Sequence, residues 1–237
     1  MSFTRISFFH FPNRDSRWWA FKQMQIAHQN LSKVDGLKFY KLLGSGAGEG
    51  FSIKPDWSVY ALLQVWESED AAKSFERTNL WYKELEEQRD YWWHFQLIPY
   101  HSKGTWKGEQ PFEINGDSIA ENYEWMAVIT RARIKWTHLI PFWLAVPSVS
   151  RVIKDQKSLL YQKGIGEWPL IEQATFSLWN QEEAMREFAY KQKAHREVVR
   201  KTRKLNWYSE EQFSRFAVAD HHGFWPNSKF ENLQKKK

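Results

Sequence analysis

Trp66-Glu-Ser-Glu-Asp-Ala71, followed by Phe75, recurs 113 residues later as Trp179-Asn-Gln-Glu-Glu-Ala184, followed by Phe188. The two stretches align without a gap. A Gly-x-Gly-Glu element also recurs upstream, at Gly46, Gly48 and Glu49 and again at Gly164, Gly166 and Glu167. Self-similarity at a fixed spacing is the sequence signature of an internal repeat. We therefore interpret the chain as two copies of one supersecondary unit.

Hydrophobic periodicity divides the first copy into strands and helices. Apolar alternation predicts strands over Arg5–Phe11, Leu37–Leu43, Ser58–Trp66 and Phe95–Tyr100. Helical spacing predicts helices over Arg17–Val34, which stops at Asp35-Gly36, and over Ser68–Tyr91. The segment Gly44–Phe51 is predicted as a loop. The order strand–helix–strand–strand–helix–strand is that of the ferredoxin-like βαββαβ unit.

The second copy repeats this order. Strands are predicted over Trp125–Ile134, Leu159–Gln162 (leading into Gly164–Trp168), Gln173–Trp179 and Gln212–Val218, and helices over Ile140–Asp155 and Gln181–Arg203. The sequence thus predicts the α+β class, with two ferredoxin-like βαββαβ repeats that pair as a dimeric α/β-barrel-type fold. The predicted division is residues 1–101 for the first repeat, 102–121 for a linker, 122–220 for the second repeat and 221–237 for a C-terminal tail.

The composition narrows the chemistry. The 237 residues contain no cysteine, which excludes disulfides, Cys-ligated zinc, iron–sulfur clusters and thiolate-ligated haem. Fifteen Trp, nine Tyr and seventeen Phe make 17% of the chain aromatic. Such a content is typical of an aromatic core, and equally of a pocket lined with rings for a large, flat, apolar ligand. Both interpretations stay open at this point.

The charge is basic and locally concentrated. The net charge is +6, and much of the excess lies in Lys191–Lys204 and in Lys235–Lys237. This pattern indicates an anionic partner such as lipid headgroups, or a solvated helix face with a frayed tail. We find no nucleic-acid-binding motif and expect no nucleic acid as a partner. The first 17 residues lack a signal-peptide pattern and no apolar run is long enough to span a membrane, so we expect a cytoplasmic protein with peripheral contact at the inner face of the membrane.

Common catalytic and nucleotide motifs are absent from the sequence. The loop Gly44–Gly50 has Glu49 where a dinucleotide-binding loop needs glycine, and it lacks the Gly-Lys-Ser/Thr of a phosphate-binding loop. A carboxylate there would repel phosphate, so we interpret the loop as a strand connection. No GxSxG or HExxH occurs, and the pair His221-His222 beside Asp220 lacks a third ligand at metal-binding spacing.

His195 is the informative histidine. Met185, Phe188, Gln192, His195, Val199 and Thr202 follow helical spacing and predict an inward-facing stripe. A hydrogen-bonded core histidine explains this placement. A neutral imidazole on a buried helix face is also what a proximal haem ligand requires.

Two arginines form a second candidate group. Arg131 and Arg133 lie two residues apart on a predicted strand and therefore on one face. They are candidates for binding a pair of ligand carboxylates such as haem propionates, and a surface salt-bridge strand explains them as well.

Several segments resemble one known family over nearly the whole chain, from Arg5 to about Phe216. They are Ile6-Ser-Phe-Phe, Trp19-Ala-Phe-x-Gln-Met24, Lys41-Leu-x-Gly-Ser-Gly-x-Gly-Glu-Gly-Phe51 with Lys54-Pro55, Thr130-Arg-Ala132, Gly164-Ile-Gly-Glu167, Pro169, Gln173-x-Thr-Phe-Ser-x-Trp179, Ala184-Met185 with Phe188, and His195 followed by Trp207. These segments resemble the spheroidene monooxygenase (acyclic carotenoid 2-ketolase) family. The glycine–glutamate segments are the most specific of them.

The resemblance implies a haem-dependent monooxygenase that introduces a keto group into an acyclic, spheroidene-like carotenoid with dioxygen. It implies haem iron as cofactor, His195 as its metal ligand, an unidentified electron donor and a homo-oligomer. Two hydroxylations at one carbon would give a geminal diol, which loses water to leave the ketone. Two alternatives remain at this point: a haem enzyme of the same fold with another reaction, such as a dehydratase or peroxidase, and a non-catalytic haem or pigment carrier.

Overall fold

The computed structural model describes residues 2–48, 50, 52–114, 116, 121–145, 156–191, 200, 202 and 204–226, without the side chains of residues 188–191. The elements of the first half are β1 (Phe3–His10), α1 (Arg14–Ile26), α2 (His28–Leu31), β2 (Leu37–Gly46), β3 (Pro55–Trp66), α3 (Glu69–Thr78), α4 (Leu80–Gln88) and β4 (Trp92–Gly104). Those of the second half are β5 (Met126–Ile134), η2 (Trp136–His138), β6 (Leu159–Trp168), β7 (Glu172–Trp179), α6 (Glu182–Lys191) and β8 (Tyr208–Gly223), and residues 139–145 are also helical.

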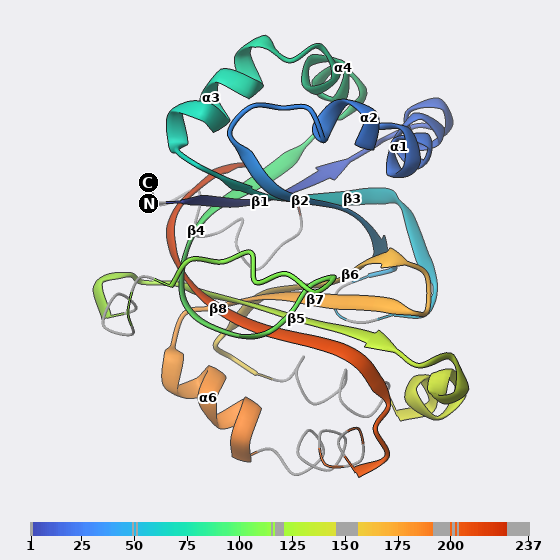
Figure 1. Ribbon diagram of the computed structural model, residues 1–237, viewed down its shortest axis with the longest axis vertical. Coiled ribbons are helices and arrows are strands. Elements are labelled where there is room, and N and C mark those ends of the chain that lie inside the picture. The colour runs from blue at the N-terminus through green and yellow to red at the C-terminus, as the bar shows by residue number, and fades with distance from the viewer. Residues whose placement is uncertain are drawn as a thin grey trace.

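Within these residues, eight strands form one closed barrel in the order β1-β3-β2-β6-β7-β5-β8-β4, and every neighbouring pair is antiparallel. Figure 1 shows the strands in the middle of the molecule, with α1–α4 above them and α6 below. The first half contributes the order β4-β1-β3-β2 and the second half β8-β5-β7-β6, which is the same order. The fold is thus a mixed α/β fold around an antiparallel barrel.

The predicted repeat is visible in the strand register. Trp66 ends β3 and pairs with Phe3 and Leu37, while Trp179 ends β7 and pairs with Met126 and Leu159. Each Trp is only 1% exposed. Each residue of β3 is therefore equivalent to the residue of β7 that lies 113 positions later. Residues of the neighbouring strands are equivalent when they pair with equivalent residues of β3 and β7.

The glycine–glutamate alignment needs a correction. Gly44 pairs with Tyr60 and Gly166 pairs with Gln173, which lies 113 residues beyond Tyr60. The structural equivalent of Gly166 is therefore Gly44 and not Gly48. The two glycines also pair with each other where β2 meets β6. The predicted loop starts later than expected, because β2 continues to Gly46.

Both long helices of the first half are interrupted. The predicted helix over 17–34 begins earlier, at Arg14, because Asn13 and Ser16 form a capping box, and it breaks at Ala27. The predicted helix over 68–91 is two helices, because Asn79 is extended and its side chain caps α4. In the second half, residues 146–155 of the helix predicted over Ile140–Asp155 lie outside the described residues, as do residues 192–199 of the helix predicted over Gln181–Arg203.

The barrel interior is aromatic. Its cluster of buried side chains contains Phe8, Trp93, Phe95, Phe176 and Phe216, whose rings pack at tilted or edge-to-face angles. Two further members, Trp106 and Phe112, come from the segment predicted as a linker. That segment therefore contributes core side chains, and the division of the chain into two repeats with a linker stays a prediction.

A second core lies outside the barrel, between the first-half strands and their helices. It buries Phe9, Leu42, Tyr60 and Leu62 from the strands against Trp81 and other helical side chains. A small apolar pocket remains in this layer beneath α1 and α4. The first-half strands are thus packed on both faces. The second half is therefore the candidate for a ligand site.

Candidate functional site: the outer face of the second half

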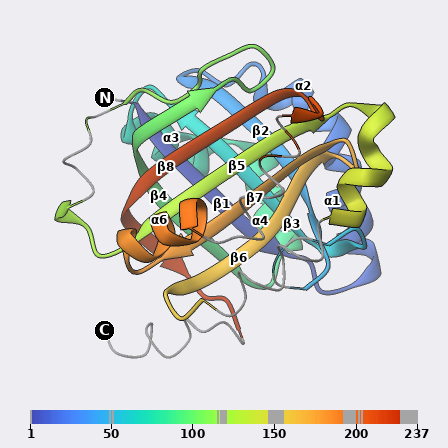
Figure 2. The same ribbon diagram turned by 90° about the horizontal axis from the view of Figure 1, so that it is seen from below.

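The outer face of β5–β8 is the candidate site. Ala127 and Ile129 of β5 belong to the barrel interior, so Val128 and Thr130 between and beside them point outward. By the same alternation, Thr175 and Ser177 of β7 and Arg215 of β8 point outward. Figure 2 looks onto these strands from below, with α6 in front of them. The sequence thus turns a face with polar and small residues toward α6.

Small residues stand on this face where the first half has large ones. The strand register makes Leu62 equivalent to Thr175, and their partners Leu42 and Gly164 equivalent to each other. It also makes Phe9, which pairs with Tyr60, equivalent to Ala132, which pairs with Gln173. Phe9 and Leu62 are each 1% exposed, whereas Ala132 and Thr175 are half-buried. At these positions the second-half face therefore has smaller side chains than the first-half face. We call it the shallow face, because a flat ligand could lie close against its strands.

One end of this face is already packed by α6. Met185 is buried and contacts the cluster of Val128, Leu159 and Trp179. Met185 and Thr202 are the two ends of the predicted inward stripe, and both are buried. His195, Gln192 and Val199 lie outside the described residues, and the side chain of Phe188 is not described. The role of His195 as an iron ligand therefore stays a prediction.

Two further histidines that could bind iron, His94 and His138, have hydrogen-bond partners away from this face. His94 lies on the outer face of the first half, where Ser7 contacts its Nδ1 and the Tyr82 hydroxyl lies 3.4 Å from its Nε2. Burial, together with the charges of Arg5 and Arg89, lowers the pKa of His94 well below 6.5, so this imidazole is neutral. His138 accepts or donates a hydrogen bond with Thr137 at 2.9 Å. Neither lies on the outer faces of β5–β8.

Arg131 and Arg133 have carboxylate partners within the chain. Arg131 is 1% exposed, points into the barrel, pairs with Glu210 and lies 3.4 Å from the Glu172 carboxylate. Arg133 is exposed and its Nε lies 3.5 Å from Glu172. The predicted contact of both arginines with ligand carboxylates stays a prediction, and the carboxylates that contact them here are those of Glu172 and Glu210.

This ion-pair group closes one end of the barrel. Burial raises the pKa of Glu210, but hydrogen bonds donated by the Gly108 N–H, Arg131 and Thr105 outweigh it and lower the pKa to about 2. Glu167 accepts a hydrogen bond from Trp106 Nε1 at 2.7 Å and lies 2.6 Å from Lys107 Nζ. The glutamate of the second glycine–glutamate segment therefore anchors the segment that seals the barrel, which is a structural role and not phosphate binding.

Arg215 was missed by the sequence reasoning. It lies on β8 with 6% exposure on the outer face, and its guanidinium carbon lies 5.2 Å from the centroid of the Phe213 ring. The signal was present: Phe216 alternates inward, so Arg215 beside it must point outward on a strand. A buried cation on this face is suited to pairing with a carboxylate of a ligand.

Comparison with known proteins places the chain in a family. It is 32% identical over 225 residues to the spheroidene monooxygenase of Rhodobacter capsulatus, covering 95% of this chain and 93% of the relative. The chain belongs to the spheroidene monooxygenase family. It is also 32% identical to the enzyme of that name from Cereibacter sphaeroides, covering 95% of this chain and 69% of the relative. The family confirms the resemblance found in the sequence and makes the chain an oxidoreductase of the monooxygenase class. No family model matches.

Solved structures confirm the fold at low sequence identity. An aldoxime dehydratase in complex with butyraldoxime superposes with a TM-score of 0.61 at 10% identity, covering 94% of this chain and 82% of that one. A second aldoxime dehydratase structure gives 0.58, also at 10% identity, covering 92% and 82%. In the parts of the chain described here, no helix is long and apolar enough to cross a membrane, and no three His, Asp or Glu side chains converge as a metal site.

Proposed function

We propose that this protein is a haem-dependent monooxygenase that introduces a keto group into an acyclic, spheroidene-like carotenoid with dioxygen. The observation that carries the proposal is the shallow outer face of β5–β8, where Ala132, Gly164 and Thr175 stand in place of Phe9, Leu42 and Leu62. Membership in the spheroidene monooxygenase family supports the carotenoid as substrate. The face fits a flat, apolar group such as haem, because no large side chain from these three positions occupies it.

Different residues of the chain would have different roles in this reaction. His195 would bind the iron, and Arg215, which is buried on this face, would pair with a propionate carboxylate. Bound haem iron would supply the oxidising chemistry of oxygen insertion, with electrons from an external reductant. The aromatic and apolar side chains around the face would hold the polyene and exclude water. Two oxygen insertions at one carbon of the substrate would give a geminal diol, which loses water to the ketone.

The repeat gives the proposal its architecture. We take each half of the barrel as a ferredoxin-like unit, supported by the shared strand orders β4-β1-β3-β2 and β8-β5-β7-β6. In this interpretation the two units pair through β2–β6 and β4–β8. The first unit stabilises the barrel, and the second holds the cofactor. We also propose that the protein meets its lipid-dissolved substrate through peripheral contact with the membrane.

The experiment is haem reconstitution followed by visible absorption spectroscopy. The wild type should develop the intense absorption band of protein-bound haem, and His195→Ala should lose it while circular dichroism stays unchanged. His138→Ala is the matched control and should keep the band. An unchanged spectrum in His195→Ala would remove this residue from the proposal.

Turnover tests the reaction itself. Reduced haem-loaded protein, supplied with an acyclic carotenoid under oxygen-18-labelled dioxygen, should form a ketone that carries the label by mass spectrometry. A haem-loaded protein that consumes no oxygen with the polyene would favour a carrier, and one that dehydrates an aldoxime instead would favour the alternative reaction.

A further inference from the structure

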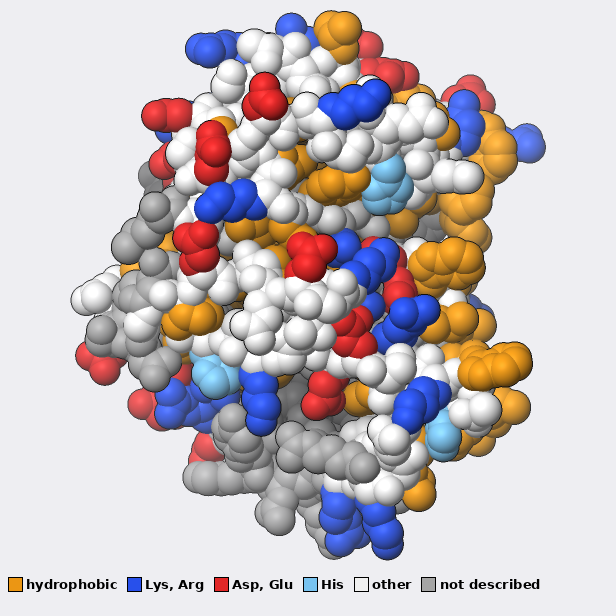
Figure 3. Space-filling view, in the orientation of Figure 1, with side chains coloured by type: hydrophobic (Ala, Val, Ile, Leu, Met, Phe, Trp, Pro, Cys, Tyr) orange, Lys and Arg blue, Asp and Glu red, His pale blue; other side chains and the backbone are white. Residues whose placement is uncertain are grey.

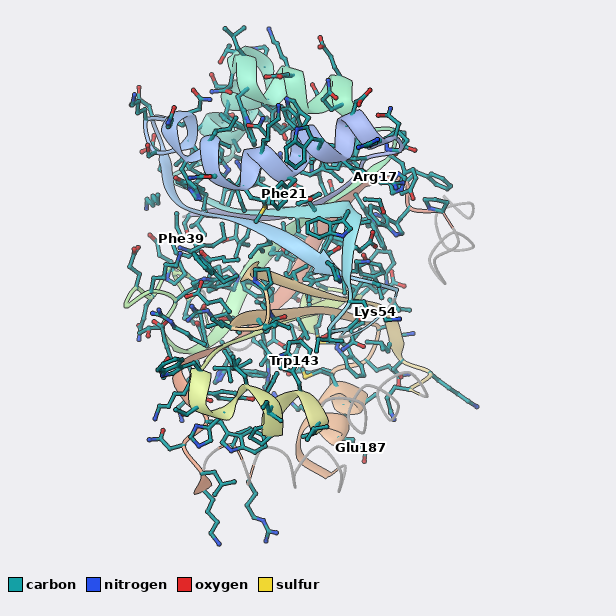
Figure 4. All side chains as sticks on the ribbon, turned by 90° about the vertical axis from the view of Figure 1, so that its right-hand side faces the viewer. Arg17, Phe21, Phe39, Lys54, Trp143 and Glu187 are labelled. Atoms are coloured by element: carbon teal, nitrogen blue, oxygen red, sulfur yellow. The ribbon has the colours of Figure 1, made fainter. Side chains whose placement is uncertain are left out.

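Exposed apolar side chains gather along one side of the molecule. We call this side the Trp-rich face and define it by Trp18, Phe21, Trp57, Trp136, Ile140 and Leu144, all of them exposed. Figure 3 shows hydrophobic side chains following the right-hand edge from the upper helices to the lower ones. In Figure 4, which turns this edge toward the viewer, Phe21 and Trp143 lie one above the other with Lys54 to their side. A monomeric protein rarely exposes so large an apolar surface without an interaction partner.

The lower part of the face is a helix that is apolar on both sides. Toward the protein, Phe142 is buried with Ile134 and Trp207. Toward solvent, Trp136, Ile140 and Leu144 are 82%, 75% and 77% exposed, one helical turn apart. A surface helix of a soluble protein normally has a polar outer side. An apolar outer side with a terminal Trp is typical of a helix that lies in the headgroup region of a bilayer.

The upper part of the face combines aromatic and basic residues. The ring of Phe21 stacks on Trp18 and meets Trp57 edge-on, with ring centroids 5.5 Å apart in both pairs. Arg14 and Lys22 lie one turn of α1 on either side of Trp18, and both are exposed. The aromatic cluster thus has two basic side chains beside it, with the exposed Asp15 carboxylate on the same turn as Arg14.

The two parts are joined by the β2–β3 connection. The Gly50 N–H donates to the Gln162 carbonyl of β6, and the Gly164 N–H donates to the Gly50 carbonyl. The lower helix is tied to the turn after β6, because Trp143 Nε1 donates to the Leu170 carbonyl. These contacts connect both halves of the barrel, so the two parts of the Trp-rich face are linked through hydrogen-bonded segments.

We propose that the Trp-rich face docks the protein onto the surface of an anionic lipid bilayer, an inference that rests on the proposed function because that function requires a lipid-dissolved substrate. The tryptophans enter the headgroup region, where one edge of the indole stays hydrated. Charge favours lipid over a second copy of the chain: a self-complementary contact would bring Arg14 and Lys22 near their own copies, whereas anionic headgroups neutralise them.

The test is sedimentation of the haem-loaded protein with vesicles of phosphatidylcholine, with and without phosphatidylglycerol. The wild type should bind the anionic vesicles more strongly. The triple variant Trp136→Ser, Ile140→Ser, Leu144→Ser should bind at least about tenfold more weakly, since each side chain loses apolar burial in lipid. Leu80→Ser is the matched control, because Leu80 is 80% exposed at the start of α4 and is not part of the face. It should bind as the wild type does.

Two further outcomes would overturn the proposal, and a third measurement separates it from the proposed function. Loss of vesicle binding only when Lys201, Arg203 and Lys204 are changed to Gln would transfer the contact to that basic stretch and overturn the face. A wild-type dimer that becomes a monomer in the triple variant, with vesicle binding unchanged, would make the face a contact between copies. Ketone formation from detergent-dispersed carotenoid should be equal in the wild type and the triple variant, so an inactive wild type there contradicts the proposed function without affecting the vesicle result.

Discussion

The two halves of the barrel share one strand order but differ in what their side chains do. Outside the barrel, Phe9 of the first half corresponds to Ala132 of the second. Inside it, Phe8, which pairs with Ala61, corresponds to Arg131, which pairs with Ala174. The first half thus has an aromatic ring at both positions. The second half has a methyl group at the outer position and a guanidinium at the inner one. The difference teaches that equivalent strand positions can carry large core side chains in one half and small or charged side chains in the other without changing the strand order.

The largest effect is expected from removing a ring of the first half. Phe9→Ala should lower the free energy of unfolding by about 3–5 kcal/mol, because Phe9 is 1% exposed and its removal leaves a cavity. Ala132→Gly, at the equivalent place, should cost about 1 kcal/mol or less. Urea unfolding measures both. Equal losses would contradict the division of roles between the halves.

A comparable loss is expected inside the second half. Arg131→Met should cost about 3 kcal/mol or more, because Glu172 and Glu210 would both lose their buried cationic partner and Glu172 would keep only the contact with exposed Arg133. Arg133→Met should change stability by about 0.5 kcal/mol or less, since this side chain is exposed and its ion pair is screened. If the two variants unfold at the same urea concentration, the buried network does not stabilise the closed barrel end.

Restoring a first-half residue in the second half should separate binding from stability. Thr175→Leu introduces the side chain that Leu62 has at the equivalent position and fills the shallow face. We expect an unchanged or slightly raised stability, and haem titration should show at least about tenfold weaker binding through steric exclusion. Thr78→Leu on exposed α3 is the control. Unchanged haem affinity in Thr175→Leu would place the ligand elsewhere.

The smallest effects are expected on the free energy of unfolding at acidic pH. The pKa of His94 is lowered in the folded chain, so the unfolded chain binds a proton first, and stability is lost as the pH falls below 6.5. Glu210 has a folded pKa of about 2 against an ordinary 4.5, so its contribution is present above pH 4.5 and is lost as the pH falls toward 2. His94→Gln should flatten the higher window and Glu210→Gln the lower one in unfolding measured against pH. A single transition unaffected by either variant would contradict the assignment.

Local patterns were enough to predict much of the fold. Alternation and helical spacing depend only on neighbours in the chain, so the strands could be predicted without the tertiary structure. Trp66 and Trp179, which were matched in the sequence, do end equivalent strands. Helix breaks were harder. Asn79 was predicted inside a helix because helical spacing continues across it, yet its side chain caps α4 instead. The family could also be predicted from the sequence, since the resemblance depends only on the order of residues in short segments.

The sequence by itself therefore determined the order of the strands, the mixed α/β class and the family, while the division into two ferredoxin-like repeats stays a prediction. Only the tertiary structure decided which faces are filled: that Trp106 enters the barrel, that Arg131 faces Glu210, and that Ala132 and Thr175 leave a shallow surface. The physical reason is that periodicity is a local property, whereas burial depends on which side chains meet across strands far apart in the chain. Equivalent positions of the two halves therefore differ in burial, since Phe9 and Leu62 are buried under the first-half helices whereas Ala132 and Thr175 are half-buried.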